Sequence, residues 1–147
     1  MKVGIGNDHA GAELKLEIMK HLEELGVDYI DYGVAPGEKI DYPDAAEMVC
    51  KEVVNGTVDR AILICGTGIG ISIAANKING IRACACSDAF SAKYTRLHND
   101  ANALCLGGRV VGAGLANELV DLFLTTEFEG GRHQRRVDLI TKLEEKY

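Results

Sequence analysis

Short apolar runs alternate along the chain with longer segments in which apolar residues recur at helical spacing. The run 61–65 is continuously apolar, which is typical of a strand buried on both faces of a parallel sheet. In 12–25, aliphatic side chains recur every three or four positions, as on one face of a helix. The pattern predicts strands at Val3–Gly6, Tyr29–Tyr32, Ala61–Cys65, Ile81–Cys86 and Ala103–Leu106. It predicts helices at Ala12–Leu25, Asp44–Val54 (with Asp44 as N-cap), Ser72–Lys77, Asp88–Leu97, Leu115–Leu124 and Arg132–Tyr147.

Five strands separated by helices are typical of parallel β-α-β units. We therefore expect an α/β protein with a three-layer, Rossmann-like fold around a central five-stranded parallel sheet. No linker, repeat or low-complexity stretch divides the 147 residues, so residues 1–147 are expected to form a single domain. The C-terminal helix is a candidate for packing on a partner subunit.

Composition and charge exclude several classes of function. Hydrophobic residues make up 47% and charged residues 26%, as in an ordinary globular domain, and no apolar run reaches the ~18 residues of a membrane span. The net charge of −6 disfavours nucleic acid as a partner. The N-terminus turns polar early, so we expect no signal peptide and a cytoplasmic protein. The odd count of 5 cysteines and the absence of CxxC spacing predict free thiols and no zinc site.

Polar and glycine-rich residues follow the predicted strands. Asp8 and His9 follow the first strand, Cys65 and the loop 66–70 end the third, and Arg109 follows the fifth. Because the carboxyl ends of parallel strands meet at one edge, where open α/β sheets bind their ligands, we expect these residues to gather there.

The loop after the third strand consists of Gly66, Thr67, Gly68, Ile69 and Gly70, so three of its five residues are glycines. Glycines allow a close approach of a ligand, and amides at the start of a helix attract anions. A tight turn without a ligand is the alternative. A dinucleotide fingerprint fits only in part, because Ile71 stands where its third small residue is required, so NAD binding is the lesser interpretation.

Cys65 stands directly before this loop. A buried strand cysteine is usually an inert small hydrophobe. Next to a helix N-terminus, however, the thiolate form is favoured, and a thiolate can act as a nucleophile or as a general base. The residues alone do not separate these two roles. The other cysteines lack this setting and are expected to serve packing.

Basic residues open the last helix, where positive charge opposes the helix dipole. Arg132 and Arg136 are four residues apart and share a face, so together they suit a phosphate group. The alternative is a solvated basic end that balances Glu144 and Glu145. A single histidine is more often structural than catalytic, and His98 is undecided from its position alone.

Seven motifs span nearly the whole chain, namely GNDHAG at 6–11, DYP at 41–43, ILICGTGIGISIAANK at 62–77, GIRA at 80–83, RLHNDAN at 96–102, GGRVVG at 107–112 and EGGRHQRR at 129–136. They resemble those of the ribose-5-phosphate isomerase B family, one of the sugar-phosphate isomerases that include the galactose-6-phosphate isomerase subunits. One branch of this family has a Glu base at the position of Ile71, so Cys65 and Ile71 place the chain in the cysteine branch.

The resemblance implies an aldose–ketose isomerase of the pentose phosphate pathway that interconverts D-ribose 5-phosphate and D-ribulose 5-phosphate through an ene-diolate. Cys65 would be the proton-transfer base, Thr67 would touch the reacting oxygens, and His98 would open the furanose ring. The loop 66–70 would bind the ene-diolate oxygens. The other substrate ligands would be Asp8 and Asn99 on the hydroxyls, and His9, Arg109, Arg132 and Arg136 on the phosphate.

The resemblance also implies that the enzyme needs no metal and no organic cofactor. It implies a homodimer or homotetramer whose site joins two subunits, with His98, Asn99 and Arg109 acting across the interface. Two alternatives stay open. One is an isomerase of a 6-phosphohexose such as allose 6-phosphate, and the other is a non-catalytic protein that binds a nucleotide or a phosphosugar.

Overall fold

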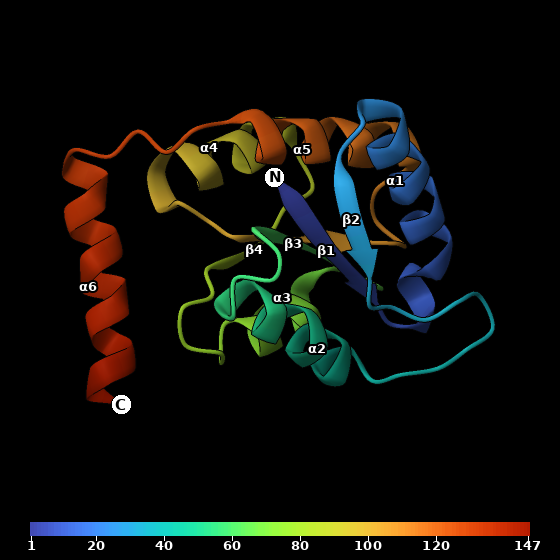
Figure 1. Cartoon of the computed structure of the whole chain (residues 1–147), viewed down its shortest axis with the longest axis horizontal. Coiled ribbons are helices and arrows are strands. Elements are labelled where there is room, and N and C mark those ends of the chain that lie inside the picture. Colours follow the sequence, from blue (N-terminus) through green and yellow to red (C-terminus); the bar gives the residue numbers. More distant parts are fainter.

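Five parallel strands form the central sheet of the computed structural model, which describes residues 1–147 (Figure 1). The order across the sheet is β2-β1-β3-β5-β4, which confirms the predicted five-stranded parallel sheet. The strands are β1 (Lys2–Asn7), β2 (Asp28–Asp31), β3 (Arg60–Cys65), β4 (Ala83–Ala85) and β5 (Ala103–Gly107).

Helices cover both faces of the sheet and complete the three layers (Figure 1). Helices α1, α4 and α5 lie on one face, and α2 and α3 lie on the other. Helix α6 stands beside the β4 edge of the sheet (Figure 1). The helices are a short 3-10 turn η1 (His9–Gly11), α1 (Ala12–Leu25), α2 (Tyr42–Val54), α3 (Ile69–Ala75), α4 (Ala89–Asn99), α5 (Ala113–Thr125) and α6 (Arg132–Lys146).

The strand order explains where a ligand can enter. From β1 the chain passes through α1 to β2 on one side, and then through α2 to β3 on the other side of β1. The connections therefore diverge between β1 and β3, and this divergence opens a crevice at the carboxyl ends of those two strands. Asn7 ends β1 and Cys65 ends β3, so the predicted site residues lie at this point.

Strand β3 is buried on both faces, as its continuous apolar pattern predicts. Ile62 and Ile64 pack into the core formed with α1 and α5, whereas Leu63 and Cys65 belong to the core formed with α2 and α3. The Cys65 side chain therefore faces the layer of α2 and α3.

The starts of α2 and α3 differ from the prediction for reasons that the local sequence explains. Helix α2 begins at Tyr42 after the extended residue Asp41, so Asp44 lies inside the first turn and is not the N-cap. Pro43 sits in that first turn, where its missing N–H costs no hydrogen bond. Helix α3 begins at Ile69 and not at Ser72, because the glycines that mask the helical pattern lie in its cap and first turn.

The other boundaries shift by at most two residues, and α5, for example, begins at Ala113 where Leu115 was predicted. Strand β4 has three residues where six were predicted, since only Ala83–Ala85 pair with β5. Helix α4 continues to Asn99, which places His98 on its last turn. Helix α6 begins at Arg132, as predicted. None of the helices is both long and apolar enough to cross a membrane.

Substitution of Gly68 would test how closely the loop 66–70 packs against β5. Its φ is 78°, and a Cβ there would lie 2.9 Å from the backbone carbon of Leu106. Gly68→Ala is therefore expected to lower the free energy of unfolding by about 2–4 kcal/mol, through both the positive φ and the overlap. Gly26→Ala is the matched control, because Gly26 has a φ of 68° and open space around it. Gly26→Ala is expected to lower the free energy of unfolding by only about 1 kcal/mol. Urea unfolding measures both values, and equal losses would contradict the packing argument.

Candidate functional site

Cys65 and the glycine-rich loop lie together at the carboxyl edge of the sheet. The Cys65 side chain is 4% exposed, and its Sγ accepts a hydrogen bond from the Gly68 N–H at 3.2 Å. Thr67 Oγ1 accepts a hydrogen bond from the Ile69 N–H at 3.2 Å. Helix α3 begins at Ile69, so the sulfur lies against backbone N–H dipoles at a helix start, which is a setting that stabilises negative charge.

Arg109 lies directly against this loop. Its backbone N–H donates to the Gly66 carbonyl at 3.0 Å, and the Gly108 N–H donates to the Cys65 carbonyl at 2.8 Å. A Cβ on Gly66 would lie 3.3 Å from Arg109 Nη1. The absence of a side chain at position 66 therefore lets a guanidinium approach the loop that carries the thiol.

Asp8 and His9 follow β1 at the same edge. The Asp8 N–H donates to the Ile64 carbonyl at 3.0 Å, which ties the end of β1 to β3. The Asp8 carboxylate is 6% exposed and accepts a hydrogen bond from the Ala10 N–H at 2.9 Å. His9 is exposed and lines a hollow of about 280 Å³ with Lys39, Ile40 and Asp41. Its imidazole is therefore accessible to a ligand.

Two residues at this edge have a clear structural role that the sequence did not predict. Asn7 is fully buried, and its side chain donates to the carbonyls of Asp8 (2.7 Å) and Val34 (3.1 Å) while accepting from the Val34 N–H. It thereby fixes the turn that carries Asp8. The Tyr42 ring lies over Gly70, where a Cβ would come within 3.0 Å of it. In the sequence, the only indication of these roles was that Asn7 belongs to the GNDHAG motif and Tyr42 to the DYP motif.

A second group of predicted site residues lies around the C-terminal end of α4. The His98 ring stacks on the His133 ring of α6, with centroids 4.0 Å apart and planes 11° apart. Arg132 Nε lies 3.4 Å from His133 Nε2 and donates to it. Arg136 lies one turn further along α6 and is exposed. Asn99 follows His98 as the last residue of α4.

The two groups lie at opposite edges of the sheet. Helix α4 runs back from β4 to the start of β5, so His98 and Asn99 come directly before the amino ends of the strands. The Ala61 N–H at the start of β3 donates to the Asn102 carbonyl at 2.8 Å, whereas Cys65 ends β3. The intervening length of β3 is roughly 13 Å. His98 and Asn99 of one chain therefore do not join Cys65 of the same chain in one pocket.

The structure also separates Arg109 from His98 and Asn99, with which the sequence analysis grouped it. Arg109 lies beside Gly66 of its own chain at the carboxyl edge. Arg132 is instead associated with His98 through His133. The candidate phosphate ligands are thus divided between the two edges, because β5 ends at the carboxyl edge and α6 begins near the end of α4.

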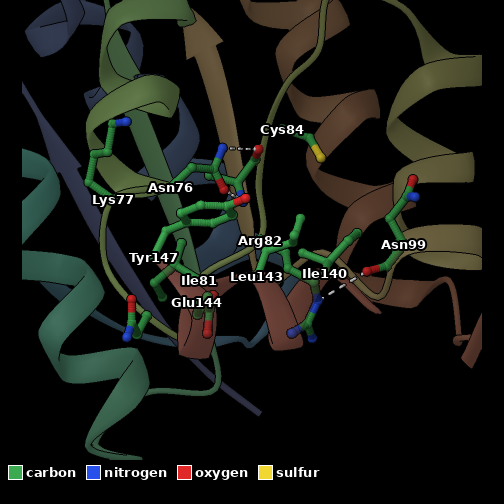
Figure 2. A pocket seen from close by; sticks show the side chains of 12 residues that line it. Asn76, Lys77, Ile81, Arg82, Cys84, Asn99, Ile140, Leu143, Glu144 and Tyr147 are labelled. Atoms are coloured by element: carbon green, nitrogen blue, oxygen red, sulfur yellow. Dashed lines mark hydrogen bonds between the residues drawn. The ribbon is translucent and has the colours of Figure 1, made fainter. Parts of the chain in front are cut away.

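The largest cavity, about 780 Å³, lies between α6 and the segment that joins α3 to β4 (Figure 2). Glu144 of α6 closes one side by accepting a hydrogen bond from the Gly80 N–H at 3.1 Å. Asn99 and Arg82 lie on its wall, and the Arg82 side chain donates to the Asn99 carbonyl at 3.1 Å. Neither Cys65 nor the glycine loop lines this cavity. Of the predicted site residues, only Asn99 lies on its wall.

The other thiols differ from Cys65 in their surroundings. Burial raises the pKa of Cys50 and of Cys86 to about 12, and it raises the pKa of Cys105 well above the ordinary value. These three thiols therefore stay protonated at neutral pH. The Cys84 Sγ accepts a hydrogen bond from the Thr95 hydroxyl at 2.6 Å. All five cysteines are free thiols, as predicted.

Comparison with known proteins identifies the family. The model of the Ribose/Galactose Isomerase family matches residues 3–140. Ribose-5-phosphate isomerase B of Escherichia coli is 53% identical over 145 residues, which are 99% of this chain and 97% of that protein.

Solved structures agree over the whole fold. The ribose-5-phosphate isomerase B of Clostridium thermocellum superimposes with a TM-score of 0.98 at 52% identity, over 100% of this chain and 99% of that one. The enzyme of Mycoplasma genitalium, solved with bound ribulose-5-phosphate, has a TM-score of 0.93 at 40% identity, over 99% and 97% of the two chains. The family resemblance seen in the motifs is therefore confirmed, and the chain belongs to the ribose/galactose isomerase family of enzymes.

Proposed function

We propose that the chain interconverts D-ribose 5-phosphate and D-ribulose 5-phosphate through an ene-diolate, in the cytoplasm and without a metal or organic cofactor. The observation that carries this proposal is the contact of Cys65 Sγ with the Gly68 N–H at the strand edge where α/β sheets bind ligands. Similarity to ribose-5-phosphate isomerases B over nearly the whole chain supports the choice of substrate.

Cys65 is the proposed base. Its thiolate takes the proton from C2 of the open-chain aldose, the C–H electrons form the C1–C2 double bond, and O1 takes up negative charge. Return of that proton to C1, with transfer of the O2 proton to O1, gives the ketose. Backbone N–H groups of the loop 66–70, with the Thr67 hydroxyl, would stabilise the developing charge on oxygen, which is a major contribution in such reactions.

His98 is the proposed group for ring opening, and a second copy of the chain has to bring it to Cys65. Within one chain the two side chains lie at opposite edges of the sheet, so a complete site needs His98 and Asn99 from a partner. Asp8 and Asn99 would bind substrate hydroxyls. The phosphate would be held by His9, Arg109, Arg132 and Arg136.

Helix α6 offers a surface for such a partner. Leu139, Ile140 and Leu143 lie on this helix and are 49%, 42% and 55% exposed. Burial of exposed aliphatic side chains of this size favours association. We therefore propose a homodimer or homotetramer in which α6 packs on a neighbouring subunit.

Activity on the five-carbon substrate is the first test. Ribose 5-phosphate mixed with the protein in the presence of a chelator, with no added cofactor, is expected to give ribulose 5-phosphate, followed as ketose formation. Allose 6-phosphate in a parallel assay is expected to turn over more slowly. Faster turnover of the hexose would move the assignment to a 6-phosphohexose isomerase. Binding of NAD or ATP without turnover of either sugar would instead indicate a non-catalytic binding protein.

Replacement of the proposed base is the second test. Cys65→Ala is expected to lower kcat for ribose 5-phosphate by roughly 10³-fold or more, because proton transfer from carbon loses its base. Binding of substrate, measured by calorimetry, should change little. Cys50→Ala is the matched control, since Cys50 is a buried core residue of α2 away from the candidate site residues, and it should keep its activity. Full activity of Cys65→Ala would assign the base to another residue.

Mixing of two inactive variants tests the shared site. Cys65→Ala and His98→Gln are each expected to be inactive, but dimers exchanged between them contain one site with both native residues. Random exchange in equal amounts should restore about a quarter of the wild-type activity, because the two sites of a symmetric dimer are equivalent. No recovery after subunit exchange, shown by mass spectrometry, would place both residues in one chain's site.

A further inference from the structure

The segment that enters α6 carries a residue with no part in the proposed chemistry, Glu129. Its backbone N–H donates to the Leu97 carbonyl at 3.0 Å, which attaches the segment to the last turn of α4 directly before His98. Gly130 and Gly131 follow with φ values of 68° and 57°, in a conformation that favours glycine. This turn brings His133 back beneath the His98 ring.

The turn places the Glu129 carboxylate beside the edges of two stacked imidazole rings. Glu129 Oε2 lies 3.6 Å from His98 Nε2 and 3.9 Å from His133 Nε2. His133 is 3% exposed and stacks on His98, and the Tyr94 ring meets the His98 ring edge-on at 4.8 Å. The His98 ring thus stacks on His133 with one face and meets Tyr94 at its side, and the 57% exposed Glu129 carboxylate lies within ion-pair distance of one of its nitrogens.

The surroundings of His133 disfavour its protonated form. Burial lowers the pKa of His133, and the neighbouring His98 and the positive charge of Arg132 lower it further. His133 therefore stays neutral at neutral pH and serves as a flat, uncharged support. When His98 takes up a proton, Glu129 is the carboxylate beside it.

His98, Glu129 and His133 are also close enough together to be considered as a metal site, but their geometry disfavours metal binding. Imidazole nitrogens bind metals along directions in the ring plane, and the two rings are nearly parallel, at 11°. Their lone pairs run side by side and do not converge on one ion. Arg132 also donates to His133 Nε2, which occupies that nitrogen.

We propose that Glu129 is a positioning residue for His98 in the opening of the furanose ring, an inference that rests on the proposed function. His98 in its protonated form gives the proton on Nδ1 to the ring oxygen O4 while the C1–O4 bond breaks. The C1 hydroxyl loses its proton to water as C1 becomes the aldehyde carbon. Neutral His98 keeps its other proton on Nε2, facing the Glu129 carboxylate, in the manner of a carboxylate that orients a catalytic imidazole.

The test compares two reactions that differ in the need for ring opening. Ribose 5-phosphate is largely a furanose, whereas ribulose 5-phosphate, with its terminal oxygen phosphorylated, cannot close such a ring. Conversion of ribose 5-phosphate therefore needs both His98 and Cys65. Exchange of the C1 hydrogen of ribulose 5-phosphate with solvent deuterium, followed by NMR, needs the base alone.

Glu129→Gln keeps the shape of the side chain and removes its charge. It is expected to slow conversion of ribose 5-phosphate by about tenfold or more, and to leave deuterium exchange within about twofold of wild type. His98→Gln should show the same split, and the double variant should lose little more than His98→Gln alone, because the two residues act as one unit. Glu127→Gln, an exposed glutamate in the same segment, should change neither reaction.

Any other result for the Glu129 variants contradicts the proposed positioning role. Equal loss of both reactions in Glu129→Gln would mean a general structural role, and no loss would mean no role. Should that variant fail to fold, Glu129→Asp is expected to show the same split to a smaller degree, and an unchanged ratio of the two rates would count against the proposal. A wild-type protein that performs neither reaction would remove the proposed function and this inference with it, whereas failure of the inference alone leaves wild-type conversion intact.

Discussion

Parallel strands end at one edge of the sheet, and the rest of the site depends on this constraint. All side chains that follow β1, β3 and β5 are gathered at the carboxyl edge, whatever their distance along the sequence. A residue that follows a returning helix is placed a full strand length away. Cys65 and Arg109 meet at the first edge for this reason, and His98 lies at the second. The candidate residues of this fold are therefore divided between two surfaces, one at each edge of the sheet.

Much of the fold was readable from the sequence because its strongest signals are local. The apolar stripe of α1 predicted its range correctly, and the unbroken apolar run of β3 predicted burial on both faces. The start of α3 was not readable, because its cap Gly68 and its first-turn Gly70 look like loop residues in a helical pattern. The Gly68 N–H also donates to Cys65 Sγ, so a glycine that obscures the helix start in the sequence contacts the candidate thiol in the structure.

The carboxyl-edge group was predictable for a similar reason, since strand ends can be located from local pattern alone. The amino-edge group was not. The contact of Glu129 with Leu97 joins positions 32 residues apart in the chain, and neither segment signals the other. His133 shows the same limit, because an isolated histidine near a helix start gives no indication that it will be buried under another imidazole. Periodicity and turn chemistry report on neighbours in sequence, whereas these contacts depend on how α4 and α6 meet.

The buried cysteines of this small core differ in what surrounds each sulfur. For Cys50 and Cys86 the surroundings are apolar, and burial raises the pKa of each thiol to about 12, which makes both inert at neutral pH. Cys65 is also buried, but its sulfur alone among the five accepts a hydrogen bond from a backbone N–H. Burial strengthens the electrostatic interaction between such a dipole and the sulfur, because less water screens it. Cys65 is therefore the one thiol of the five whose negative charge a backbone dipole would stabilise.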